Sequence, residues 1–217
     1  MKLLLTSTGI TNESIKKALE ELVEKPLGEL KIAFIPTAAN VEKGGKEWLI
    51  KNFNEFKNLG FKEIDVVEIA VLSEDVLKER LENVDVLVFG GGNNSYLNYW
   101  LTKSGLKEML PEMLKSKVWV GISAGSMVTS KKIELGEFDE KYFGVDDKES
   151  GLKGLGLTDF YVSPHFNSPN FPKLRTARLE EASKDYPDPV YAIDDQTAIK
   201  VVDGEIEVIS EGEWEKF

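Results

Sequence analysis

The sequence predicts an α/β fold, a three-layer sandwich in which a mostly parallel sheet lies between two layers of helices. Short, almost continuously apolar segments alternate with amphipathic segments from residue 2 to residue 89. Strands that are buried on both faces lose the alternation of apolar and polar residues, so these runs favour parallel pairing. The 217 residues are enough for one such unit, and we expect residues 1–217 to form a single α/β domain.

The elements of the first half follow in order along the chain. Apolar runs predict strands at residues 2–7, 31–36, 63–69 and 85–89. Apolar residues at helical spacing predict helices over 13–25, 46–59 and 73–81. Thr11 or Asn12 is suited to cap the first helix, and Gly60 to end the second. We expect functional residues in the loops that follow the carboxyl ends of the strands.

The second half is expected to add strands at residues 118–120, 160–163, 190–193, 197–202 and 205–209. Asp203-Gly204 is a typical hairpin turn between the last two. A helix is expected around residues 174–179. Residues 129–158 are polar, acidic and interrupted by glycines, so we expect a long excursion over the end of the sheet that serves as a lid or specificity loop.

Composition excludes several classes of protein. The net charge of −11 disfavours nucleic acid and anionic membranes as partners. The chain has no cysteine and one histidine, which excludes disulfides, thiolate metal sites and sites built from several imidazoles. We expect no metal and no cofactor. The apolar run at the amino terminus is three leucines, too short for a signal peptide and better explained as a first strand. The lack of cysteine fits a cytoplasmic protein, which we expect.

The strongest chemical signal is Gly121-Ile122-Ser123-Ala124-Gly125, directly after an apolar strand. The pattern G-x-S-x-G at a strand-to-helix turn is the nucleophile elbow, which raises a serine on a strained backbone. Glycine is favoured on both sides because a Cβ there would crowd the turn. The amide of Ala124, at the start of the next helix, is suited to stabilise an oxyanion. The alternative is an ordinary turn that happens to contain a serine.

Three successive glycines, residues 90–92, follow the fourth predicted strand and precede a helix. Their amides can approach a ligand closely because no side chain intervenes. Neither the phosphate-binding loop pattern nor the dinucleotide-binding pattern is matched, so nucleotide binding has little support. Beside a serine elbow, the natural use of this loop is a second oxyanion donor; the alternative is a plain turn.

His165 and the pair Asp194-Asp195 also follow apolar strands, as Ser123 does. A serine needs a base to take its proton, and a carboxylate holds the imidazole of that base in the correct tautomer. We therefore expect these three points to meet at the same end of the sheet. Asp195 is the favoured carboxylate. The other candidates are Asp194, Asp159 and Glu134.

Four segments, taken together, resemble the peptidase E and cyanophycinase family of serine peptidases. They are GGGN at 90–93, GISAG at 121–125, SPHF at 163–166 and YAIDDQTA at 191–198. The resemblance runs from the first strand to about residue 202. It implies a flavodoxin-like or class I glutamine amidotransferase-like fold, and a triad in the chain order serine, histidine, carboxylate.

By motif position, the resemblance implies that Ser123 is the nucleophile, His165 the base and Asp195 the acidic residue. It implies that the oxyanion amides belong to Gly92 and Ala124. The family commonly has Glu where this chain has Asp195, so the acidic side chain here is one methylene shorter.

The resemblance also implies how an N-terminal aspartate of the substrate is held. In the peptidase E branch this is done by an asparagine after the glycines, matched by Asn93, and by an arginine beyond the histidine, for which Arg175 is the candidate. An arginine can clamp a carboxylate through two hydrogen bonds. The chain departs from that branch at Asn94, where threonine is usual, and in a shorter segment between His165 and Arg175. The alternative for Arg175 is an ordinary surface cation.

The leading hypothesis is a cytoplasmic serine exopeptidase, a monomer or a homodimer, that hydrolyses small peptides, among them dipeptides with an N-terminal aspartate. The alternative is a noncatalytic ligand-binding or regulatory protein on the same fold. A thiol-dependent amidotransferase is excluded because position 123 is Ser and the chain has no cysteine.

Overall fold

The computed structural model describes residues 1–133, 153–184 and 186–217. Its larger sheet is built from the following strands: β1 (Lys2–Thr6), β2 (Lys31–Ile35), β3 (Glu63–Val66), β4 (Val86–Phe89), β5 (Val118–Ile122), β8 (Thr197–Val202) and β9 (Glu205–Ser210). Their order is β3-β2-β4-β5-β1-β8-β9. The strands β3, β2, β4, β5 and β1 pair in parallel, and β8 and β9 add an antiparallel edge.

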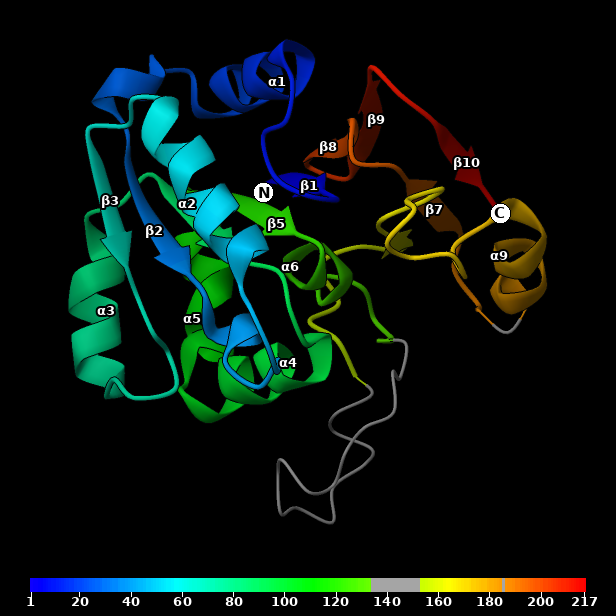
Figure 1. The fold of residues 1–217 in the computed structure, drawn as a ribbon. Coiled ribbons are helices and arrows are strands. Elements are labelled where there is room, and N and C mark those ends of the chain that lie inside the picture. Colours follow the sequence, from blue (N-terminus) through cyan, green and yellow to red (C-terminus); the bar gives the residue numbers. More distant parts are fainter. Residues whose placement is uncertain (134–152, 185) are drawn as a thin grey trace.

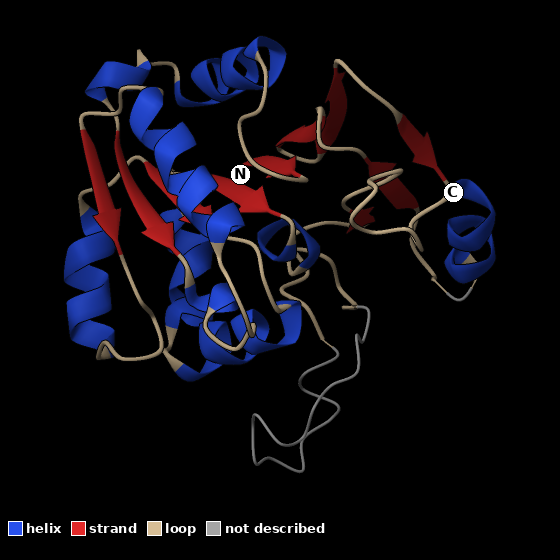
Figure 2. Cartoon of the chain, in the orientation of Figure 1, coloured by secondary structure: helices blue, strands red, loops and turns tan. Residues whose placement is uncertain are grey.

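Helices cover both faces of this sheet (Figures 1 and 2). One face carries α1 (Glu13–Val23) and α2 (Glu47–Asn58), and the other carries α3 (Glu74–Glu82), α4 (Asn94–Lys103) and α5 (Leu106–Met113). Successive residues of β1 show why the strand is apolar throughout. Leu4 packs in one cluster with Ile15 of α1, whereas Leu3 and Leu5 pack in the other with Leu97 of α4. The predicted mostly parallel three-layer fold is therefore confirmed.

A single residue explains where α1 begins, and another explains where α2 ends. Asn12 rather than Thr11 caps α1, because its Oδ1 accepts a hydrogen bond of 2.9 Å from the Ile15 amide. Gly60 lies just beyond α2 with a φ of 78°, a left-handed conformation that glycine adopts without a Cβ penalty. Helix α5 was not among the predicted elements, and Pro111 inside it is unfavourable to a helix interior.

A second sheet holds β6 (Tyr161–Ser163), β7 (Val190–Ile193) and β10 (Trp214–Lys216), in the order β10-β7-β6. Helix α9 (Thr176–Ser183) follows β6 in the chain. The sequence predicts the strands before His165 and Asp195 in the same sheet as Ser123, and this prediction is wrong. The short strand β10 pairs antiparallel with β7, so β7 is enclosed between β10 and β6. After β7 the chain returns to the larger sheet at β8.

Two further predictions are modified. The third strand ends at Val66 instead of residue 69. The expected lid or specificity loop over 129–158 falls largely on residues 134–152, which lie outside the described residues, as does Glu134. Within the described ranges, no helix combines the length and the apolar composition that crossing a membrane requires.

Candidate active site

Ser123 lies on a strained turn between β5 and α6 (Ala124–Met127). Its backbone has a φ of 48° and a ψ of −105°, a region that residues with a Cβ rarely occupy. Glycine is required on both sides of the serine because a side chain would not fit there. A Cβ on Gly125 would lie 2.0 Å from the carbonyl oxygen of Phe89, and one on Gly121 would lie 2.6 Å from the carbonyl oxygen of Gly125. The crowding expected of an elbow is therefore present on both sides.

The glycine loop after β4 lies against the elbow. A Cβ on Gly91 would be 3.5 Å from the Cβ of Ser123. Gly92 has a φ of 129°, and a Cβ there would lie 2.3 Å from the carbonyl oxygen of Ala38. Ala124 is the first residue of α6, so its amide has no acceptor one helical turn earlier. The two amides named from the sequence thus belong to the loop that lies against Ser123, for Gly92, and to the residue that follows Ser123, for Ala124.

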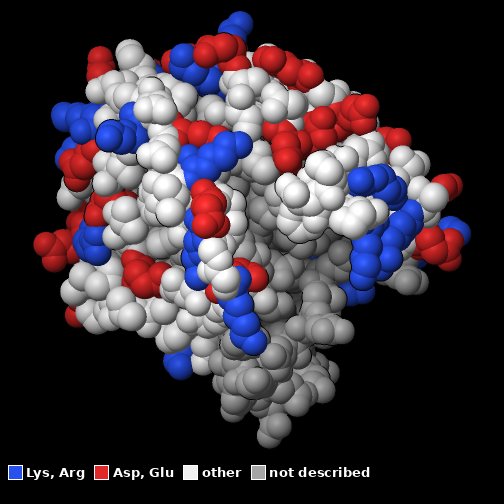
Figure 3. Space-filling view, in the orientation of Figure 1, with Lys and Arg blue, Asp and Glu red and all other residues white. Residues whose placement is uncertain are grey.

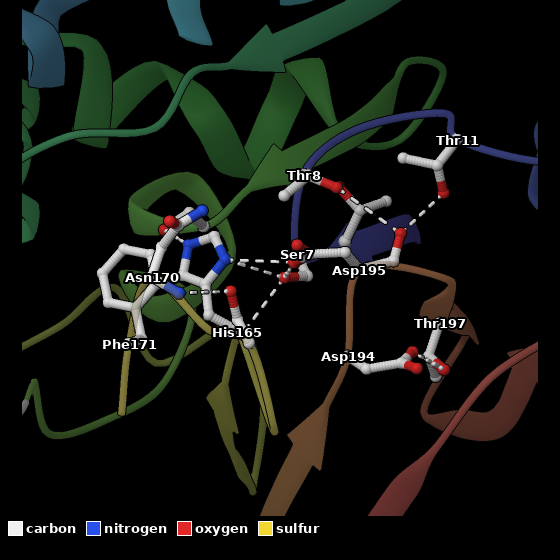
Figure 4. A network of polar contacts seen from close by, with 12 residues as sticks. Ser7, Thr8, Thr11, His165, Asn170, Phe171, Asp194, Asp195 and Thr197 are labelled. Atoms are coloured by element: carbon white, nitrogen blue, oxygen red, sulfur yellow. Dashed lines mark hydrogen bonds and ion pairs between the residues drawn. The ribbon is translucent and has the colours of Figure 1, made fainter. Parts of the chain in front are cut away.

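His165 follows β6 and contacts the elbow serine. Its Nε2 lies 3.0 Å from the Oγ of Ser123. The histidine has a φ of 63°, another left-handed conformation. Its ring stacks on Phe171, with centroids 4.2 Å apart and an interplanar angle of 7°, as Figure 4 shows. The ring is therefore held between an aromatic face and the network behind it.

Asp195, in the turn between β7 and β8, contacts the other nitrogen of the imidazole. Its Oδ1 lies 3.1 Å from the Nδ1 of His165. Burial raises the pKa of Asp195, but hydrogen bonds from His165 and Ser7 and the charge of Lys51 lower that pKa by more, so it lies below its usual value. The carboxylate is thus ionised at neutral pH and presents an oxygen to Nδ1 of His165.

The other candidate carboxylates have different partners. Asp194 turns away from the imidazole (Figure 4): it accepts hydrogen bonds from the Thr197 hydroxyl at 2.7 Å and from the Glu213 amide at 2.7 Å. These bonds tie the β7–β8 turn to the segment that leads into β10. Asp159 is exposed and forms an ion pair of 2.6 Å with Lys131.

Ser7 belongs to the same network, although no motif in the sequence singles it out. Its hydroxyl donates to Oδ1 of Asp195 at 2.5 Å, and lies 3.2 Å from Nδ1 of His165. It also accepts a bond of 2.9 Å from the backbone amide of His165. The available signal was weak: a small hydroxyl residue directly follows the strand that pairs with β5.

Asn93 and Arg175 do not line the cavity in front of Ser123. The Oδ1 of Asn93 accepts a bond of 2.8 Å from the Tyr96 amide and so caps α4. The guanidinium of Arg175 donates to the carbonyl oxygens of Phe171, Leu174 and Ser168, at 3.1, 2.9 and 3.0 Å. The arginine thereby holds together the loop that carries Phe171.

A cavity of about 600 Å³ opens in front of Ser123. Phe171 and Trp48 contribute aromatic walls and are 44% and 38% exposed. Lys43 and Lys51 line the same cavity, together with Glu42. Basic side chains are interspersed with acidic ones over the face shown in Figure 3. The negative net charge therefore does not leave the mouth of the cavity uniformly acidic.

A serine on a strained strand-to-helix turn of an α/β sandwich, in contact with an imidazole and facing a cavity, defines a serine hydrolase. The chain matches the model of peptidase family S51 over residues 3–209. It therefore belongs to this family and is a serine-type peptidase. The resemblance to peptidase E found in the sequence is confirmed.

Relatives and solved structures agree with this placement. An uncharacterised peptidase of Pasteurella multocida is 30% identical over 182 residues, which cover 82% of this chain and 84% of the relative. Peptidase E of Nostoc sp. is 29% identical over 215 residues, 95% of this chain and 84% of the relative. In both cases the match covers 84% of the relative's length.

Two crystal structures show the same fold. A Listeria monocytogenes protein described as a candidate peptidase E superposes with a TM-score of 0.76 at 24% identity, covering 97% of this chain and 98% of its own. A peptidase from an acI-B1 Actinobacterium superposes with a TM-score of 0.65 at 23% identity, covering 100% of this chain and 93% of its own. At these identities the likeness concerns the fold alone.

Proposed function

We propose that this serine-type peptidase is an exopeptidase that hydrolyses small peptides, with Ser123 as nucleophile, His165 as general base and Asp195 as the orienting carboxylate. The observation that carries the proposal is the 3.0 Å separation between Nε2 of His165 and Oγ of Ser123. It lies within the range over which a base can take the proton of a hydroxyl.

The reaction proceeds in two halves. Ser123 Oγ attacks the carbonyl carbon of the peptide bond while its proton passes to Nε2 of His165. The same proton then moves to the departing amine, and the acyl group stays on Ser123. A water molecule, deprotonated by His165, releases the acyl group as a carboxylic acid and regenerates the hydroxyl. Asp195 stabilises the imidazolium that forms in each half.

The oxyanion of each tetrahedral intermediate is held by the amides of Gly92 and Ala124. Backbone donors in the position of these two are preorganised, so they cost no rearrangement as the charge develops. Removing one such donor costs about 10²–10³-fold in kcat in serine peptidases. This role agrees with the absence of any side chain on residues 90–92, which lets the backbone come close to the substrate.

The shape and charge of the cavity favour short peptides. Its volume of about 600 Å³ lies in the range of small-molecule sites. Trp48 and Phe171 offer apolar surface for a side chain, and Lys51 offers a cation for a terminal carboxylate. The side chain of Lys51 is 71% exposed and its ion pair with Glu55 is long, at 3.6 Å. A substrate carboxylate can therefore compete for it.

Preference for an N-terminal aspartate remains a prediction that the contacts of Arg175 do not support. Its guanidinium donors are directed at three carbonyl oxygens rather than at the cavity. A comparison of Asp-Leu with Leu-Leu as substrates tests the preference. Equal turnover, or faster hydrolysis of Leu-Leu, removes the aspartyl specificity and leaves the peptidase assignment intact.

The decisive experiment is a hydrolysis screen over a dipeptide library with wild-type protein and the Ser123→Ala variant. Removing the nucleophile is expected to lower kcat by roughly 10⁴-fold or more, with an unchanged fold by circular dichroism. Unchanged turnover would refute the role of Ser123. Binding of peptides without turnover by the wild-type protein would favour the noncatalytic ligand-binding alternative.

The site also bears on domain organisation. Ser123 comes from the larger sheet, whereas His165 and Asp195 follow strands of the smaller one. We propose that residues 1–217 work as one domain, since separating the sheets would separate the hydroxyl from its base. A single cooperative unfolding transition is the expected outcome, and two resolved transitions would contradict it. The cytoplasmic location and the choice between monomer and homodimer stay predictions.

A further inference from the structure

Ser7 occupies the centre of the polar network behind the imidazole. It follows β1 and is 1% exposed. Its Oγ has three polar neighbours, which are the backbone amide of His165 at 2.9 Å, Oδ1 of Asp195 at 2.5 Å and Nδ1 of His165 at 3.2 Å. Figure 4 shows the hydroxyl between the histidine and the aspartate. The reaction proposed above gives Ser7 no part, yet its partners are the base and the acid.

The protons around this hydroxyl can be counted. A serine hydroxyl has one proton to donate and two lone pairs to accept with. The backbone amide of His165 can only donate, so it uses one lone pair. Ionised Asp195 can only accept, so it takes the proton. The lone pair that remains faces Nδ1 of His165.

That count leaves one tautomer of the neutral imidazole. Both oxygens near Nδ1, those of Ser7 and Asp195, present a lone pair to it, so a proton on Nδ1 is stabilised and a lone pair there would be repelled. Nε2 then carries the lone pair and can accept the proton of Ser123, at 3.0 Å. The other tautomer would place a proton between Nε2 and the nucleophile and block the first step.

The same segment of backbone also supports the elbow. The carbonyl oxygen of Thr6 accepts bonds from the Ser123 amide at 3.0 Å and from the Ser126 hydroxyl at 2.8 Å. Ser7, the next residue, bonds the amide of His165, whose φ of 63° is unfavourable for a residue with a Cβ. Adjacent residues at the end of β1 therefore hold the nucleophile on one side and the base on the other.

We propose that Ser7 is a positioning residue that holds His165 as the Nδ1–H tautomer and fixes its ring between Asp195 and Ser123. The polar contacts of its hydroxyl are to His165 and Asp195 rather than to Ser123, so it acts on the reaction through the base. Its effect on turnover rests on the proposed function of His165 as the base, but its effect on the tautomer does not. The alternative is a structural role in which Asp195 alone sets the tautomer and Ser7 fills space at the end of β1.

The test uses the fact that His165 is the single histidine of the chain. In protein labelled with ¹⁵N-histidine, both ring nitrogens give assignable signals, whose shifts report the tautomer at a pH where the ring is neutral. Wild-type protein is expected to show a protonated Nδ1 and an unprotonated Nε2. In Ser7→Ala the two signals are expected to move toward each other, as exchange between tautomers requires.

Kinetics provide the second readout. Ser7→Ala is expected to lower kcat by about 10-fold or more with little change in KM. The base is misaligned, whereas the cavity wall changes little because Ser7 is only 1% exposed. Ser7→Cys, which keeps a similar volume but bonds weakly, should give intermediate values. Ser7→Thr, which keeps the hydroxyl, should restore the tautomer. Ser130→Ala is the matched control, since it removes a buried hydroxyl that bonds Met127 and Lys132 carbonyls.

The outcomes separate a positioning role of Ser7 from a purely structural role. A wild-type ring protonated on Nε2, or a Ser7→Ala ring with the wild-type tautomer, would overturn the inference, whatever the activity. If Ser7→Ala does not fold, the same comparison is made between wild-type protein and Ser7→Cys. If wild-type protein hydrolyses no peptide but the tautomer shifts in the variants, the positioning role stands and the proposed function fails.

Discussion

The two halves of the candidate active site are held by different kinds of contact. The elbow around Ser123 is set by backbone packed so closely that side chains at Gly121 and Gly125 would overlap their neighbours. The pair formed by His165 and Asp195 is set by hydrogen bonds and by one aromatic stack, and the side chain of Asp195 is 41% exposed. The nucleophile is thus fixed by sterics within a buried sheet, whereas the base is fixed by polar contacts near solvent.

Substitutions in the two halves should therefore have different consequences for stability and activity. A change at the elbow should disturb stability and activity together, because the strained turn and the core share the same atoms. A change around His165 should disturb activity more than stability, because few buried apolar contacts depend on it.

The largest combined effect on stability and activity is expected for Gly125→Ala. The new Cβ would lie 2.0 Å from the Phe89 carbonyl oxygen, so the backbone of the elbow must shift. We expect the free energy of unfolding to fall by about 3 kcal/mol, and kcat/KM to fall by more than about 100-fold. Denaturant titration and dipeptide hydrolysis measure the two quantities.

Gly28→Ala is the matched control for this substitution. A Cβ there would lie 3.6 Å from the carbonyl oxygen of Gly60, an ordinary contact distance. Its stability should stay within about 0.5 kcal/mol of wild type. If Gly125→Ala matched Gly28→Ala in both measurements, the steric account of the elbow would be wrong.

The next effect concerns Phe171, which stacks on the imidazole and is 44% exposed. Phe171→Ala should lower kcat by about 10-fold, since the ring of His165 gains freedom to rotate away from Ser123. The free energy of unfolding should change by only about 1 kcal/mol. Phe171→Tyr keeps the aromatic face and should retain most of the activity. Equal kcat in all three proteins would show that the stack does not position the base.

The elbow around Ser123 could be predicted from the sequence, whereas the polar network around His165 could be predicted only in part. The elbow could be predicted because its requirements are local: an apolar strand, a serine and two glycines within five residues. The five parallel strands also leave nearly continuous apolar runs, and α1, α2 and α3 leave apolar residues at helical spacing. Ser7 leaves none, because its partners His165 and Asp195 lie 158 and 188 residues further along the chain. Only tertiary structure brings them together.

The second sheet and the role of Arg175 could not be predicted for related reasons. Strand β10 has three residues, too few to show a period, and without it β7 has no reason to leave the larger sheet. An arginine beyond the histidine can equally clamp a ligand carboxylate or three backbone carbonyls, since its donors suit both. The sequence around Arg175 carries nothing that separates these uses.

A smaller effect is expected at the mouth of the cavity. Lys51→Gln should raise KM about five-fold for dipeptides with a free carboxyl terminus, since an exposed ion pair contributes about 1 kcal/mol. The KM for the same dipeptides with an amidated terminus should not change. Lys57→Gln, on the same helix but outside the cavity, is the control. An equal rise in KM for free and amidated substrates would remove Lys51 from carboxylate recognition.

The smallest effect is the contribution of Asp195 to stability, and it has a defined sign with pH. Hydrogen bonds from His165 and Ser7 outweigh burial and hold the pKa of Asp195 below its usual value. The stabilisation is therefore present in full above the usual carboxyl pKa of about 3.9, and is lost as the pH falls through the lower pKa of the folded state. Since the side chain is 41% exposed, screening limits the effect to about 0.5 kcal/mol.

The measurement compares the free energies of unfolding of wild-type protein and Asp195→Asn from pH 7 down to pH 3. Wild type should be the more stable by a constant amount down to about pH 4, and the difference should shrink below that. A difference that grows in acid would mean that burial, not hydrogen bonding, dominates the carboxylate. The half of the site near solvent would then be held by packing as the elbow is, and the contrast between the two halves would disappear.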